Sequence, residues 1–172
     1  LSSGDYPELD ALICHLADIY CGQGVSVALP SLRIDSFLRG YAEQLQRLRK
    51  SGLTFAPEAG SQRLRDAINK GVCEQDLVGS VTDAFENGWN RVKLYFMIGL
   101  PEETDEDLDA IGDLADRVVE CYYGVNKTRR GRGLTVHVSA STFVPKPFTP
   151  FQWEPQASFA AIEAKQRRLQ VR

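Results

Sequence analysis

The sequence predicts an α/β protein of parallel (βα) repeats, and a sector of a (βα) barrel is one architecture that fits it. Short apolar runs alternate with longer amphipathic runs along the 172 residues, the pattern of parallel strands joined by crossover helices. The short runs are rich in β-branched residues, which is typical of strands covered on both faces. An open doubly wound sheet fits the same alternation.

The first elements follow this alternation from the start of the chain. Residues 1–3 have the pattern of a strand end, and apolar residues at helical spacing predict a helix over 7–21, with Pro7 in its first turn. A strand at 25–29 and a helix at 35–52, which stops at a glycine, come next.

The middle of the chain contributes two strands and two helices. A strand is predicted at 53–57 and another at 91–99, both apolar and rich in β-branched or aromatic residues. Between them lie helices at 61–71 and 74–88, each of which ends at a glycine.

The last elements have clear end signals. A helix is predicted over 104–123, with Thr104 as its cap and Asp107 at the capping-box position. A strand at 134–142 and a helix at 155–172 complete the chain. The segment between them is rich in proline and aromatic residues, so we expect it to pack rather than to act as a flexible linker.

Composition narrows the class of protein. Apolar residues make up 43% of the chain and charged residues 25%, which is typical of one globular domain over residues 1–172. The net charge of −3 gives no sign of a nucleic-acid partner, and no apolar run has the length of about 20 residues that a membrane span needs. We therefore expect a cytoplasmic protein.

The four cysteines do not have the spacing of a metal site. Cys14, Cys21, Cys73 and Cys121 form no C-x2-C pair, so we interpret them as small buried residues in a reducing compartment. His15 and His137 are likewise interpreted as structural residues.

Strand 91–99 carries the clearest indication of a polar site. Because side chains alternate along a strand, Lys93, Tyr95 and Met97 share one face, and the positions between them are all apolar. A lysine in a fully apolar core would be costly, so the first face should line a polar interior. Gly99 and Pro101 then allow a sharp turn close to a ligand.

Three segments, taken in order, resemble the radical S-adenosylmethionine (SAM) superfamily. These are "APEAGSQRLRDAINKGV", "LYFMIGLPEETDED" and "VSASTFVPKPFTPFQW". The resemblance implies a sector of a partial (βα)6 TIM-like barrel, from its second to its sixth βα unit. The third segment is similar to a subgroup that carries a cobalamin-binding domain. Cobalamin is therefore a further cofactor that the resemblance allows in the full-length protein.

The resemblance also implies which residues contact SAM. Ser3, Gly4 and Asp5 take the place of the family's loop for the amino group, although the Gly-Gly-Glu form is absent. Glu58 matches the position that reaches the ribose or the amino group. Ser61 caps the helix that follows.

The remaining site positions come from the later strands. Lys70 lies where a basic residue meets the SAM carboxylate, and Lys93 faces the same interior. Tyr95, Met97, Gly99 and Glu102 align with the family's G-x-I-x-G-x-x-E pattern, with Tyr for the first Gly and Met for Ile; Glu102 would support the loop. Val144 and Pro145 would form the adenine wall.

The family's C-x3-C-x2-C motif, which binds a [4Fe-4S] cluster, is absent from the sequence. Because the chain opens on a strand end, we expect a piece of a longer chain whose other parts, including the first βα unit, are its partners. The full-length protein would cleave SAM reductively to a 5′-deoxyadenosyl radical, and the piece alone would be inactive. It could also self-associate through its exposed sheet edge.

A different class of protein fits the same strands. A (βα) barrel or flavodoxin-like domain could serve as a non-catalytic binding or assembly module, with the strand-end residues acting only in turns. That alternative predicts Lys93 on an outer surface and no cleft shaped for SAM.

Overall fold

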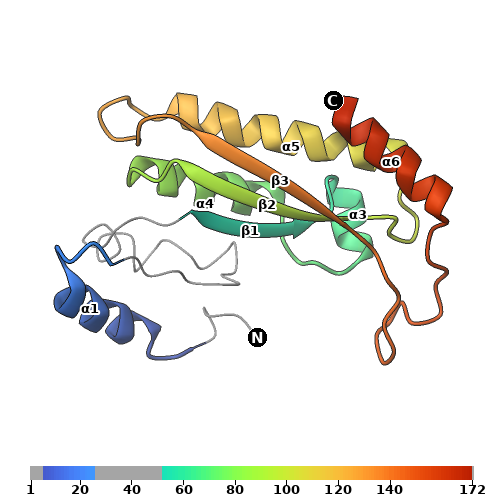
Figure 1. The fold of residues 1–172 in the computed structure, drawn as a ribbon, viewed down its shortest axis with the longest axis horizontal. Coiled ribbons are helices and arrows are strands. Elements are labelled where there is room, and N and C mark those ends of the chain that lie inside the picture. Colours follow the sequence, from blue (N-terminus) through green and yellow to red (C-terminus); the bar gives the residue numbers. More distant parts are fainter. Residues whose placement is uncertain (1–5, 26–51, 172) are drawn as a thin grey trace.

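Three parallel strands form the centre of the fold. In the computed structural model, which describes residues 6–25 and 52–171, they are β1 (Leu53–Glu58), β2 (Arg91–Ile98) and β3 (Thr135–Thr142). They pair in the order β1-β2-β3, as Figure 1 shows. The protein is therefore a mixed α/β structure with neighbouring strands in sequence order.

Five helices accompany the sheet within residues 6–25 and 52–171. They are α1 (Leu9–Tyr20), α3 (Gln62–Ala67), α4 (Glu74–Glu86), α5 (Asp105–Gly124) and α6 (Phe159–Val171). The predicted strand end at 1–3 and the predicted helix at 35–52 lie outside the described residues, as does the predicted strand at 25–29 apart from its first residue. The other predicted strands and helices are present, with shifts at their ends.

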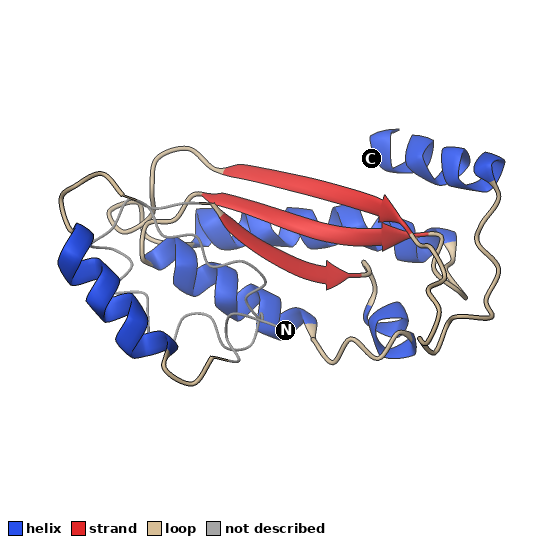
Figure 2. Ribbon diagram, turned by 60° about the horizontal axis from the view of Figure 1, so that its bottom comes forward, coloured by secondary structure: helices blue, strands red, loops and turns tan. Residues whose placement is uncertain are grey.

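One face of the sheet carries the core. Val92, Leu94, Phe96 and Ile98 are buried, in alternation with more exposed positions along β2. They form one apolar cluster with side chains from α4 and α5, and Figure 2 shows both helices behind the strands. The alternation predicted for β2 is confirmed, and Lys93, Tyr95 and Met97 point to the opposite face.

Two helix boundaries differ most from the prediction. Helix α3 ends at Ala67 rather than at residue 71, because Asn69 and Gly71 both have positive φ angles (53° and 62°) that a helix does not accept. Helix α6 begins at Phe159, where the Ser158 side chain accepts the N–H of Ala161 at 3.2 Å. No helix in the described ranges is long and apolar enough to cross a membrane.

Candidate functional site

The carboxyl end of β1 turns sharply at Glu58. The pairing register of β1 with β2 shifts between Phe55 and Glu58, and Glu58 has a φ angle of 70°, which is unusual for a residue with a side chain. The Lys70 ammonium donates to the Glu58 carboxylate at 3.1 Å. The structure therefore joins two of the predicted site residues in an ion pair.

Asp107 connects this turn to α5. Its carboxylate is buried and accepts hydrogen bonds from the Ser61 hydroxyl and the Arg63 guanidinium, and from the Thr104 N–H at 2.7 Å. Burial alone would raise the pKa of Asp107, but these hydrogen bonds outweigh it and hold the pKa below its usual value of 3.8. Asp107 is therefore an anion that fixes the starts of both α3 and α5.

Ser61 has a second structural role. Its hydroxyl accepts the N–H of Leu64 at 3.1 Å, so it is the N-cap of α3, as predicted. The same hydroxyl donates its proton to Asp107, so both of these hydrogen bonds are made within the protein. The structure thus gives Ser61 a role in shaping the β1 exit.

Gly60 and Arg65 complete this turn. A Cβ atom at Gly60 would lie 2.7 Å from the Ala110 carbonyl carbon, so only glycine lets the turn pack directly on α5. Arg65 is buried and donates to the carbonyls of Ala59 (3.0 Å) and Gly60 (2.7 Å). Burial lowers the pKa of the Arg65 guanidinium.

The exit of β2 is held by Glu103. Both oxygens of this carboxylate accept the Gly99 N–H, at 2.9 and 3.1 Å, and the Lys165 ammonium of α6 donates to it at 2.7 Å. Glu102, the residue that the sequence pattern suggests as the loop support, is exposed and has a φ angle of 63°. Its neighbour Glu103 therefore holds the loop. Because glutamates stand side by side at 102 and 103, the sequence does not show which of them bonds to Gly99.

Gly99 packs against the last helix. Its φ angle is 76°, and a Cβ atom there would lie 2.7 Å from the Ile162 side chain and 3.3 Å from Ala157. The space beside Gly99 is therefore filled by the protein itself on that side. Gly99 allows both the turn and the close approach of the segment that leads into α6.

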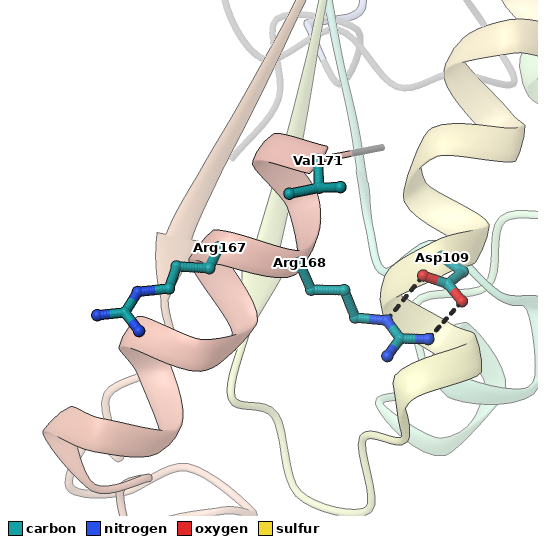
Figure 3. Close-up of a pocket in the computed structure, with 4 residues that line it drawn as sticks. All are labelled: Asp109, Arg167, Arg168 and Val171. Carbon is teal, nitrogen blue, oxygen red and sulfur yellow. Dashed lines mark hydrogen bonds and ion pairs between the residues drawn. The ribbon is translucent and has the colours of Figure 1, made fainter.

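Two further ion pairs attach α6 to α5. The Arg168 guanidinium donates to both carboxylate oxygens of Asp109 (2.8 and 2.6 Å), which Figure 3 shows, and to Asp105 at 2.8 Å. The Asp109 carboxylate raises the pKa of Arg168. Figure 3 also shows Arg167 directed away from Asp109, so Arg168 is the residue that links the helices.

A pocket of about 380 Å³ lies at the carboxyl ends of β2 and β3. Its lining is apolar on one part and hydroxylated on another, with a single cation. The lining residues are Met97, Ser141, Thr142, Phe143, Val144, Lys146, Thr149 and Phe151.

The loop after β3 is folded into a fixed shape beside this pocket. The Phe143 and Phe151 rings meet edge to face at 6.0 Å, and the Thr149 hydroxyl donates to the Lys146 carbonyl at 2.7 Å. The Gln152 N–H donates to the Thr149 carbonyl at 3.0 Å. The pocket wall is thus built by the proline-rich segment that the sequence predicted to pack.

The predicted site residues divide into separate groups. Met97 and Val144 meet in the pocket, whereas Pro145 is next to Val144 in sequence but does not line it. Lys93 lies on the same face of β2 as Met97 but nearer the start of the strand, with its ammonium 4.5 Å from the centre of the Tyr95 ring. Ser3, Gly4 and Asp5 lie outside the described residues.

The sequence missed most of the pocket lining. Phe143, Lys146, Thr149 and Phe151 all come from the segment after β3, and only their nearness to Val144 could have indicated them. Their positions depend on how the loop folds back, which no local pattern determines.

The described residues contain no group of three or more His, Cys, Asp or Glu side chains placed to hold a metal ion. All four cysteines are free thiols, and they lie on three different helices or beside them. These cysteines therefore do not fit a [4Fe-4S] cluster, which needs thiolates gathered around one point.

Comparison with known proteins identifies the class. The family model of the Radical SAM superfamily matches residues 2–115, and the chain belongs to this superfamily. Its members use SAM together with a [4Fe-4S] cluster.

One relative is an uncharacterized protein of Methanocaldococcus jannaschii, to which the chain is 37% identical over 154 residues. The match covers 89% of this chain and 30% of that relative, so the chain spans about a third of the relative's length.

Proposed function

We propose that this chain binds SAM, with the adenosyl group in the pocket at the ends of β2 and β3. The observation that carries the proposal is the pocket itself, because its 380 Å³ fall within the range of about 300–1,000 Å³ that small-molecule sites occupy. Family membership supplies the class of ligand.

The pocket lining fits the two parts of an adenosyl group. Met97, Phe143 and Val144 offer apolar contact to a purine. The Thr142 hydroxyl can donate to a ring nitrogen, while the Ser141 and Thr149 hydroxyls, which donate to backbone carbonyls, can accept from ribose hydroxyls. Folded over the pocket, the loop after β3 would exclude water from the bound nucleoside. The Glu103 contact with Gly99 keeps the β2 exit in the shape that this requires.

We further propose that the sheet is a sector of a (βα)6 barrel. The strand order β1-β2-β3 follows the sequence, and α4 and α5 cover the same face. A doubly wound sheet would instead reverse its strand order and place helices on both faces.

In our proposal, the residues that the structure describes do not bind the [4Fe-4S] cluster. SAM and the [4Fe-4S] cluster together give the family its 5′-deoxyadenosyl radical. Since the four cysteines here do not gather, we assign the cluster ligands to other parts of a longer protein. The present residues then bind and orient SAM.

Calorimetric titration of the purified protein with SAM and S-adenosylhomocysteine tests the proposal. We expect saturable binding, and Val144→Asp should weaken it at least about ten-fold, because a carboxylate in an apolar wall costs more than about 1.4 kcal/mol. The matched control is Val138→Asp, since Val138 (46% exposed) and Val144 (51%) are similarly accessible and Val138 does not line the pocket.

The control should bind like the unmodified protein, because an outer strand tolerates a charge. Equal loss in both variants, or no binding by the unmodified protein, would contradict the proposal. The second result would favour the non-catalytic module.

A further inference from the structure

The open face of the sheet carries a strip of cations and hydroxyls below the pocket. Arg91, Lys93 and Tyr95 follow each other on this face of β2, away from the helix-covered core. The parallel register places Thr135, His137 and Ser139 of β3 directly beside them. Neighbouring strands lie about 4.8 Å apart, so each pair of side chains can contact one small ligand.

These cations have no anionic partner in the described part of the chain. Neither Arg91 nor Lys93 forms an ion pair there, and the recorded contact of the Lys93 ammonium is with the Tyr95 ring. Glu58 is the one carboxylate on the three described strands, and it is paired with Lys70. Among the residues that the structure describes, the strands of the open face therefore present positive charge and hydrogen-bond donors without an unpaired carboxylate.

We infer that this strip binds the anionic end of an elongated substrate. The inference rests on the proposed function, because it takes the pocket at Met97 as the place of the adenosyl group. Lys93 precedes Met97 by four residues, and at about 3.3 Å per residue their Cα atoms are about 13 Å apart. A substrate that reaches both regions has a phosphate or carboxylate about 13 Å from its reacting carbon.

Different side chains of the strip contact different parts of the substrate. Lys93 and His137, which are partners in the strand register, flank the anion, and Arg91 adds charge at the lower end of the strip. The Tyr95 and Ser139 hydroxyls form the next row toward the pocket and can donate to the anion or to the substrate chain. Tyr95 is 37% exposed, so this row is accessible.

Backbone NMR of the isotope-labelled protein, titrated with inorganic phosphate and separately with acetate at constant ionic strength, tests the inference. We expect saturable shifts centred on the amides of residues 93, 95, 137 and 139. Lys93→Met should weaken binding about ten-fold, as expected for loss of one charge-assisted hydrogen bond. The matched control is Lys127→Met, which removes an exposed lysine from the loop before β3. The stronger of the two anions identifies the substrate class.

Shifts spread over the whole basic surface, or equal loss in Lys93→Met and Lys127→Met, would overturn the inference. Calorimetry with SAM separates the two proposals, because Lys93→Met should leave SAM affinity unchanged. If Lys93→Met loses both SAM binding and phosphate binding, Lys93 belongs to the SAM site and the inference is overturned. Phosphate binding by a protein that does not bind SAM would overturn the proposed function alone.

Discussion

At the scale of single residues, Asp107 shows how one buried carboxylate shapes the site. It accepts hydrogen bonds from the β1 exit and from the start of its own helix, so it joins segments that are far apart in the sequence. The sequence predicted its capping-box role with Thr104, which depends on local spacing. The contacts with Ser61 and Arg63 depend on tertiary packing, so no local pattern could indicate them.

Gly60 supplies the sharpest test at this scale. Gly60→Ala should lower the free energy of unfolding by about 2 kcal/mol or more, because the new methyl group would overlap the α5 backbone, which cannot move aside cheaply. The measurement is urea denaturation followed by circular dichroism.

Gly79→Ala is the matched control. Gly79 lies inside α4, and a Cβ atom there meets nothing within 4 Å. This substitution should stabilise the protein by about 0.5–1 kcal/mol, because alanine favours helix more than glycine does. A loss at Gly79 as large as the loss at Gly60 would show that the predicted overlap is not the cause.

At the scale of elements, the sequence predicted strands better than helix ends. The apolar alternation of β2 determined its start and its buried face, and its end lies one residue before the predicted one. Helix α3 is shorter than predicted. Gly71 predicts the end of the helix, but Asn69 already has a backbone φ angle outside the helical region. The attachment of α6 was not predictable, since Lys165 and Arg168 resemble an ordinary solvated helix face in the sequence.

Lys165 tests that attachment. The Lys165 side chain is 19% exposed, and its ammonium pairs with Glu103, whose side chain is 2% exposed. Lys165→Met should destabilise the protein by about 2 kcal/mol, because a buried carboxylate loses its cation, and hydrogen exchange at the Gly99 amide should become faster.

The matched control is Arg167→Met on the same helix. Arg167 pairs with Glu163 at 2.8 Å, and both side chains are largely solvated. The expected change is below about 0.5 kcal/mol. If both variants behave alike, the Glu103 contact does not hold α6 in place.

At the scale of the whole molecule, the sequence predicted an α/β class with parallel strands, and the structure confirms it. The three family segments lie at the carboxyl ends of the strands, yet they do not form a single cluster: Glu58 and Lys70 pair with each other, while Met97 and Val144 line the pocket. Alternation along a strand predicts which face a side chain takes. It does not predict how a long loop returns to close a cavity.

The proposed function assigns SAM binding to this chain and the cluster ligands to other residues, which leads to a prediction for the whole chain. Anaerobic treatment with iron and sulfide should leave this protein without a stable [4Fe-4S] cluster, because its four thiols are not gathered. Iron and sulfide content after desalting is the measurement, with a radical SAM enzyme that carries the C-x3-C-x2-C motif treated in parallel. A stable cluster that supports SAM cleavage would contradict the assignment of the cluster ligands to other residues.

The bond between Glu103 and Lys165 also has a consequence for biosynthesis. Lys165 follows Glu103 by 62 positions, so the buried carboxylate leaves the ribosome well before its counter-ion exists. At about 5–20 residues per second, that delay is about 3–12 seconds. During this interval the nascent polypeptide holds an uncompensated acid beside Gly99, and the exit of β2 reaches its final shape only after Lys165 has been added.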